Sequence, residues 1–97
     1  MTLREAKRRL ARERTALRAL HVRHISVFGS TARDEAGPHS DVDLLVEFEP
    51  GLVGLFTFVR VLDALADQLG TRIDLATPQA LRPEMRDEIL GEAVRVF

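Results

Sequence analysis

Two short segments constrain the fold of this chain more than any others: Gly29-Ser30 and, after ten intervening residues, Asp41-Val42-Asp43. A glycine followed by a hydroxyl residue suits a tight turn whose backbone N–H groups and side-chain oxygen can bind an anion. Two acids at positions i and i+2 share one face of a strand, where their charges repel unless a cation lies between them. We therefore expect a strand before the glycine and a second strand that carries the acids.

Three segments have the pattern of β-strands: residues 25–28, 41–48 and 72–76. The first is a β-branched and aromatic run, the second alternates apolar and polar residues, and the third is a short apolar run interrupted by one acid. Asp41 and Asp43 lie on the face of the second strand that is opposite its apolar residues, and Asp74 likewise points away from the core. If these two strands are neighbours, the three carboxylates converge.

Four helices are predicted, over residues 3–20, 31–35 and 52–69, and from Pro83 onward. The first begins with a capping box, in which the Thr2 hydroxyl accepts from the Glu5 N–H and the Glu5 side chain reaches back. Gly70 is the expected stop of the long helix, and Thr77-Pro78 resembles an N-cap followed by proline. The residues expected to face the core are Leu3, Ala6, Leu10, Leu17 and Leu20, then Leu55, Phe58, Val59, Leu62, Leu65, Ala66 and Leu69, and finally Met85, Ile89, Ala93 and Val96.

The order of these elements predicts an α/β or α+β fold, with helices over one or both faces of a small mixed sheet. Ninety-seven residues with 45% apolar content indicate one domain, residues 1–97, with little surface for a separate substrate-binding lobe. The chain has no cysteine, which excludes disulfides and cysteine-containing zinc sites. Because no long apolar stretch or apolar leader is present, we expect a soluble, cytoplasmic protein.

The charge distribution is uneven along the chain. A net charge of −1 argues against a general nucleic-acid binder, so no direct nucleic-acid binding is expected. The first quarter is nevertheless rich in basic residues: Arg4, Lys7, Arg8, Arg9, Arg12, Arg14, Arg18 and Arg23. Two interpretations are open, a solvated face of an amphipathic helix or a docking face for an acidic partner or RNA.

Three segments together resemble the minimal nucleotidyltransferases (MNT) of the DNA polymerase β superfamily: residues 27–33, 40–46 and 72–75. The ending, from residues 81–84 through 93–94, is also similar to that family's last helix, so the resemblance covers nearly the whole chain. The short length and this ending resemble the subset encoded beside HEPN-domain toxins as antitoxins.

The resemblance implies a polymerase-β-like nucleotidyltransferase fold and transfer of AMP from ATP, with release of pyrophosphate, to a tyrosine of a HEPN-domain toxin. The residues implied to bind the nucleotide are Gly29, Ser30, Thr31 and Arg33. The residues implied to be catalytic and to hold two Mg²⁺ ions are Asp41, Asp43 and Asp74. The family often has a basic residue where Thr31 stands, and the spacing leaves open whether Arg33 contacts a phosphate or pairs with Asp34 or Glu35.

Three hypotheses about function are left open by the sequence. In the first, the chain is an active adenylyltransferase that modifies its toxin. In the second, it is an antitoxin that masks the toxin by binding alone, without catalysis. In the third, the nucleotide is transferred to a small molecule such as an aminoglycoside or to tRNA, which the lack of a substrate lobe disfavours. Assembly with further copies of itself or with the toxin is compatible with each.

Overall fold

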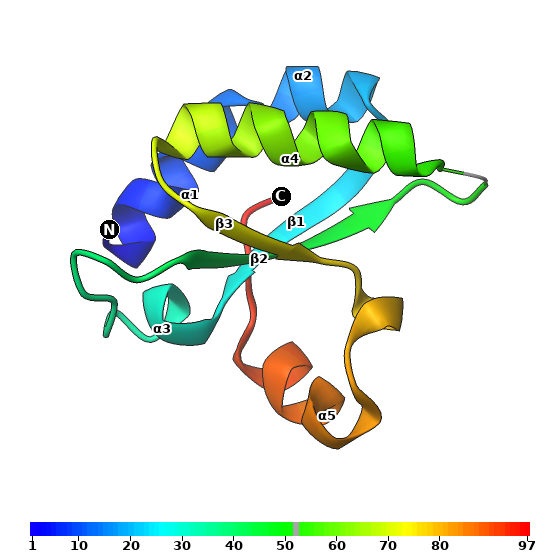
Figure 1. Ribbon diagram of the computed structural model, residues 1–97. Coiled ribbons are helices and arrows are strands. Elements are labelled where there is room, and N and C mark those ends of the chain that lie inside the picture. Colours follow the sequence, from blue (N-terminus) through cyan, green and yellow to red (C-terminus); the bar gives the residue numbers. More distant parts are fainter. Residues whose placement is uncertain (52) are drawn as a thin grey trace.

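The computed structural model describes residues 1–51 and 53–97, and Figure 1 shows the course of the chain. The elements follow in the order α1 (Leu3–Arg12), α2 (Arg14–Ala19), β1 (Val22–Phe28), α3 (Gly29–Ala32), β2 (Val42–Phe48), α4 (Leu55–Leu69), β3 (Ile73–Ala76), a 3₁₀ turn η1 (Pro78–Ala80), α5 (Pro83–Glu92) and β4 (Val94–Arg95). The strands form one mixed sheet in the order β3-β2-β1-β4, in which β1 is antiparallel to β2 and β4 and β2 is parallel to β3. The predicted small mixed sheet is confirmed.

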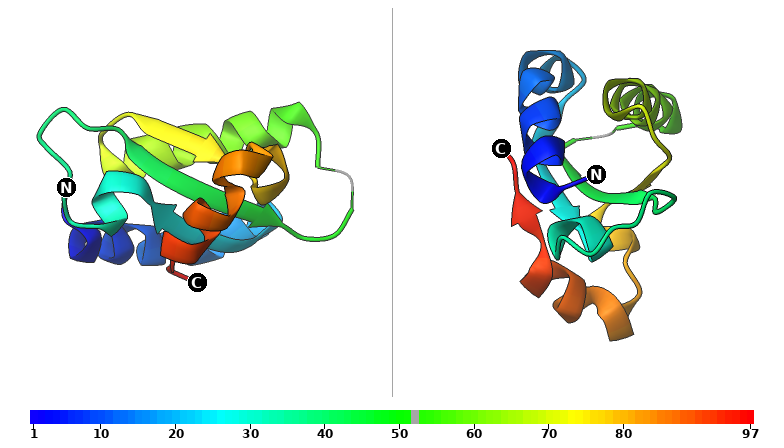
Figure 2. Two further views of the ribbon diagram at one scale, coloured as in Figure 1. Left: turned by 90° about the horizontal axis from the view of Figure 1, so that it is seen from below. Right: turned by 90° about the vertical axis from the view of Figure 1, so that its left-hand side faces the viewer.

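The main core lies between one face of the sheet and the helices α1, α2 and α4, which Figure 2 shows together on that face. The alternation of β2 directs Val42, Leu44 and Val46 into this core, as expected, and Leu10 and Leu65 meet them from the helices. Each such side chain contributes about 1.5–3 kcal/mol through its burial, so this layer supplies most of the stability.

The opposite face of the sheet is covered only in part, by α5, which crosses it in Figure 2. A small cluster of Phe28, Leu45 and Ile89 holds α5 in place, with Ala76, Leu81 and Ala93 packed around it. This cluster lies next to the end of the sheet where β2 begins. The acids of β2 and β3 are therefore on a face that α5 borders.

The predicted first helix is broken, because α1 ends at Arg12 and α2 starts at Arg14. Glu13, at φ −91° and ψ 4°, lies between them and donates its N–H to the carbonyl of Leu10. Nothing local marks this break, since glutamate is a good helix former and the apolar spacing continues to Leu17, which is fully buried. Packing against the sheet, rather than helix propensity, therefore decides where the helix ends.

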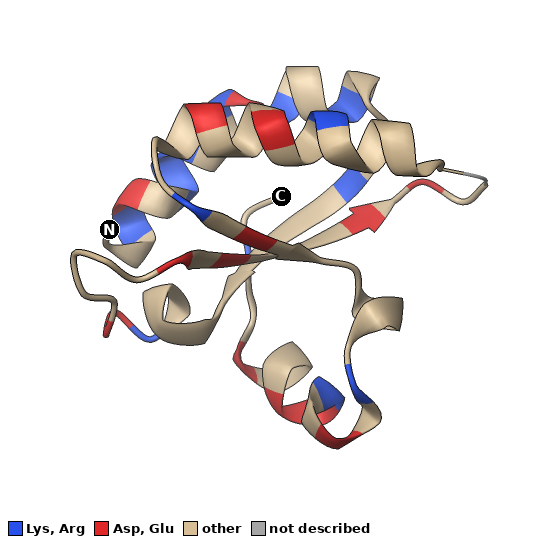
Figure 3. Cartoon of the chain, viewed as in Figure 1, with Lys and Arg blue, Asp and Glu red and all other residues tan. Residues whose placement is uncertain are grey.

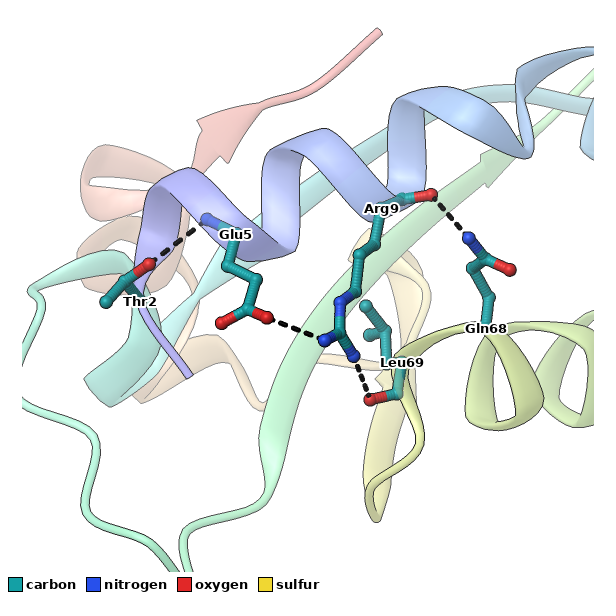
Figure 4. A network of polar contacts seen from close by, with 5 residues as sticks. All are labelled: Thr2, Glu5, Arg9, Gln68 and Leu69. Carbon is teal, nitrogen blue, oxygen red and sulfur yellow. Dashed lines mark hydrogen bonds and ion pairs between the residues drawn. The ribbon is translucent and has the colours of Figure 1, made fainter.

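The predicted capping box is half right. Thr2 Oγ1 accepts from the Glu5 N–H at 3.1 Å, as expected, but the Glu5 carboxylate pairs with Arg9 at 2.6 Å instead of reaching back. Arg9 also donates to the carbonyl of Leu69 at 3.0 Å, and the Gln68 amide donates to the carbonyl of Arg9 at 3.3 Å (Figure 4). Arg9 thus ties α1 to the end of α4, while most of the basic residues predicted as a solvated face are exposed.

The predicted faces of the last two helices are corrected at several positions. Helix α4 begins at Leu55, after the N-cap Gly54, and the expected start near Leu52 falls outside the described residues. Leu55 and Val59, both expected to face the core, are 78% and 43% exposed, whereas Val61, which was not expected there, is buried. Met85, expected to face inward, is 48% exposed. Gly70 ends α4 as predicted, at φ +64°.

Helix α5 ends earlier than the apolar spacing of the sequence predicts. The helix stops at Glu92, and β4 pairs with β1 opposite Ser26 and Val27. A strand of two residues is too short to show periodicity, so it could not be predicted from the sequence. Within the described residues, no helix is both long enough and apolar enough to cross a bilayer.

Candidate active site

The turn after β1 requires glycine for two separate reasons. Gly29 has φ +67°, a conformation that costs residues with a Cβ atom free energy. A Cβ built at Gly29 would also overlap Oδ2 of Asp43 and lie 3.0 Å from its Cγ. The absence of a side chain at position 29 therefore makes room for the Asp43 carboxylate, which places the turn and the acid in direct contact.

Asp43 and Asp74 are paired residues on the parallel strands β2 and β3, on the face opposite the main core. Figure 3 shows these acidic segments side by side at one end of the sheet. Asp41 lies one residue before β2 and forms a loose ion pair with Arg72, at 3.7 Å. The structure therefore brings the predicted acids to one corner of the sheet, with Asp43 half-buried and Asp41 and Asp74 exposed.

The electrostatics of this corner favour a bound cation. Partial burial raises the pKa of Asp43 above its ordinary value, and the negative charges of Asp74, Asp41 and Glu92 raise it further. Arg33 opposes these charges only in part. Carboxylate oxygens are the ligands that Mg²⁺ prefers, so the chemistry of the donors fits a divalent ion. Among the described residues, no three acidic or histidine side chains already form a ligand set for one ion, so ion binding would have to draw them together.

The residues predicted to bind nucleotide occupy different environments. Ser30 is half-buried in the first turn of α3, beside Gly29. Thr31 is only 1% exposed and its hydroxyl has no hydrogen-bond partner among the described residues. It lines a cavity together with Glu5 and Arg9 of α1 and with Ser40 and Val42, the residues on either side of Asp41. Little of the Thr31 side chain is accessible to a ligand, and nucleotide binding at Thr31 stays a prediction.

Arg33 forms ion pairs in this structure. Its Nε donates to Glu35 at 3.2 Å, which is one of the two roles that the sequence left open. Its Nη1 donates to Glu92, the last residue of α5, at 2.9 Å. The other Glu92 oxygen accepts from the Gly29 N–H at 3.0 Å. The N–H of Gly29 is therefore already bonded, and an anion at the turn would have to use its neighbours.

Sequence reasoning missed Glu92 as a member of this site. It is 63 residues from Gly29 and belongs to a helix with several other acids, so no local pattern distinguishes it. A cavity of about 460 Å³ lies elsewhere, at the far end of β2 beside Glu47 and Glu49, and is not lined by the three aspartates. The arrangement of charged groups, rather than the volume of a cavity, identifies the candidate active site.

A mixed sheet that carries acids on adjacent strands above a glycine turn places this fold and site in the class of nucleotidyltransferase domains. The family model described as "Nucleotidyltransferase domain" matches residues 7–96. The chain belongs to this family, as the resemblance of its motifs predicted.

The chain is similar to other proteins and to solved structures over nearly its full length. It is 38% identical to protein adenylyltransferase MntA of Thermococcus cleftensis, across 99% of this chain and 97% of that protein. A solved structure described as a minimal nucleotidyltransferase is 36% identical, with a TM-score of 0.81 over 97% of this chain and 95% of that one. A chain from the complex of a tri-AMPylated Shewanella oneidensis HEPN toxin with its MNT antitoxin is 14% identical, with a TM-score of 0.66 over 99% and 72%, and shares the fold.

Proposed function

We propose that this protein is a Mg²⁺-dependent protein adenylyltransferase that transfers AMP from ATP to a tyrosine of a HEPN-domain toxin and thereby acts as its antitoxin. The observation that carries the proposal is the pairing of Asp43 with Asp74 on adjacent strands, directly above Gly29. The similarity to a protein adenylyltransferase over almost the whole chain supports protein as the acceptor. The fold shared with an MNT antitoxin complex supports a toxin as the partner.

Each residue of the site has a role in the proposed reaction. Asp41, Asp43 and Asp74 would hold Mg²⁺, which when bound neutralises phosphate charge and stabilises the attacking and leaving oxygens. The Ser30 hydroxyl and the N–H groups of the first turn of α3 would bind the terminal phosphates. Because β3 is an edge strand and Asp74 is exposed, its carboxylate is accessible to an acceptor that approaches from outside.

The proposed reaction exchanges one P–O bond for another. The tyrosine oxygen forms a bond to the α-phosphorus of ATP while the bond from that phosphorus to the bridging oxygen breaks, and pyrophosphate leaves. The proton of the tyrosine hydroxyl passes to Asp74. The exposure of Asp41 and Asp74 at a corner of the sheet suits an acceptor on the surface of another macromolecule, because no lobe of this chain would have to enclose it.

The test is transfer of label from [α-³²P]ATP to the purified cognate toxin in the presence of Mg²⁺. We expect label on the toxin from the α position and none from [γ-³²P]ATP, since the γ-phosphate leaves with pyrophosphate. Asp43→Asn should abolish the transfer. Glu47→Gln is the matched control, because Glu47 is an exposed acid on the same strand and face, away from the site.

Each alternative function has its own outcome. Absence of label on the toxin with folded wild-type protein contradicts the proposal. If Asp43→Asn fails to transfer label yet still protects cells from the toxin as well as the wild type does, the protein acts by binding alone. Label on tRNA or on an aminoglycoside in reactions without toxin would replace the proposed acceptor with that one.

A further inference from the structure

One carboxylate reaches the candidate active site from the far end of the chain. Glu92 accepts from the Gly29 N–H through Oε1 at 3.0 Å and from Arg33 Nη1 through Oε2 at 2.9 Å. Its side chain is 24% exposed, whereas that of Arg33 is 46% exposed. The Glu92 carboxylate thus joins α5 both to the tight turn at Gly29 and to the guanidinium group of Arg33.

The ion pairs of Arg33 leave most of its hydrogen-bonding capacity free. A guanidinium group has five N–H donors in one plane. In the described residues, Glu35 takes the donor on Nε and Glu92 takes one on Nη1, so three of the five remain. Arg33 is also linked through Glu92 to Gly29, where a Cβ atom would lie 3.0 Å from Asp43 Cγ. A cation with free donors is therefore fixed beside the carboxylates.

We propose that Glu92 is a positioning residue for nucleotide binding, which holds the Gly29 turn and the Arg33 guanidinium so that the free N–H groups of Arg33 meet a phosphate of ATP. This inference rests on the proposed function. A long, exposed arginine normally has to be ordered when it binds an anion, which weakens binding. Here the carboxylates of Glu92 and Glu35 order it during folding, so less of that cost falls on ATP binding.

If Glu92 competed with the nucleotide instead of positioning its binding groups, removal of its charge would change ATP affinity in the opposite direction. If the Glu92 carboxylate competed with phosphate for the Gly29 N–H and for Arg33, its removal would tighten ATP binding. If it positions these groups, its removal loosens binding. Measured nucleotide affinity therefore separates the two roles.

The experiment measures the dissociation constant of ATP with Mg²⁺ by calorimetry, without toxin, for wild type, Glu92→Gln and Glu88→Gln. Glu88 is an exposed acid on the same helix, one turn away, and controls for loss of charge from α5. We expect Glu92→Gln to raise the dissociation constant about fivefold to tenfold, since the amide keeps the shape but loses the charge that holds Arg33. Glu88→Gln should bind ATP as the wild type does.

A double-variant cycle distinguishes positioning from a general effect on folding. If Glu92 acts largely through Arg33, adding Glu92→Gln to Arg33→Gln should weaken ATP binding by less than Glu92→Gln weakens it in the wild type, because only the bond to the Gly29 N–H is then lost as well. Additive losses, or unchanged or tighter binding by Glu92→Gln, would overturn the inference while leaving the proposed function intact. If the wild type itself binds no ATP in the presence of Mg²⁺, the proposed function and this inference both fail.

Discussion

Replacing Gly29 by alanine tests the contact between the turn and the Asp43 carboxylate. Alanine at φ +67° costs about 1–2 kcal/mol relative to glycine. The new Cβ atom would also overlap Asp43 Oδ2, and crowding of this kind costs about 1–3 kcal/mol more. We therefore expect Gly29→Ala to lower the free energy of unfolding by about 2–5 kcal/mol, a large part of the stability of a small domain.

Gly70→Ala is the matched control for the backbone part of this effect. Gly70 has φ +64°, close to the value at Gly29, but a Cβ atom there would meet nothing within 4 Å. Its replacement should cost only the backbone term, about 1–2 kcal/mol. The difference between the two variants then measures the overlap with Asp43. Urea unfolding followed by circular dichroism, at pH 7 without Mg²⁺, provides both values.

A double-mutant cycle tests whether the extra cost of Gly29→Ala over Gly70→Ala comes from the Asp43 carboxylate. In the background Asp43→Ala, the side chain that Gly29→Ala would strike is absent, so the cost of Gly29→Ala should fall to that of Gly70→Ala. Equal costs for Gly29→Ala and Gly70→Ala in the wild-type background would refute the reasoning, because they would show that Asp43 does not lie over the turn. Loss of AMP transfer by Gly29→Ala at temperatures where it remains folded would show that the contact also serves catalysis.

Three further predictions concern the acids and the packing. Because the folded state raises the pKa of Asp43, the charged carboxylate destabilises the fold as the pH rises from about 3.8 through the raised pKa. Asp43→Asn should therefore be more stable than wild type at pH 7 but not below pH 3.5. Added Mg²⁺ should raise the melting temperature of wild type but not of this variant. Leu65→Ala should lower the free energy of unfolding by about 2–5 kcal/mol in urea, whereas Leu55→Ala should change it by less than about 0.5 kcal/mol; similar losses would contradict the observed face of α4. Arg9→Ala should cost about 1 kcal/mol by the same measurement through its bond to the end of α4, and the exposed Arg8→Ala should cost almost nothing; equal values would mean that the bond contributes no stability.

The parts of the site that lie close together in sequence could be predicted from it. The alternation around Asp43 fixed which face of β2 carries the acids, since a shift of one residue would bury them. The position of Asp74 in a short apolar run gave the same information for β3. That these two strands are neighbours remained a conditional expectation, and the register of Asp43 opposite Asp74 confirms it.

The parts that could not be predicted depend on contacts between distant segments. Glu92 looks like any other acid of an exposed helix until the fold places it against Gly29. Thr31 lines a cavity with Glu5 and Arg9 of α1, and the sequence around Thr31 says nothing about that helix. The stripe predicted for α4 is wrong at Leu55 because the apolar spacing continues into the first turn of the helix, where the side chain is exposed.

The position of α5 restricts how an acceptor can reach the acids. Ile89 packs on Phe28 and Leu45, so the part of the sheet face next to the acids is covered by the helix. Asp74, by contrast, is exposed on β3, which is an edge strand of the sheet and pairs with β2 on its other side. A tyrosine that approaches past β3 meets Asp74 before it meets Asp43, which lies half-buried over the glycine turn. In the proposed reaction, Asp74 at the edge would therefore accept the hydroxyl proton, and Asp43 would lie near the phosphates. Asp74→Asn should accordingly lower the rate of transfer more than it lowers ATP affinity, and an equal loss in both would remove Asp74 from the proton-transfer role.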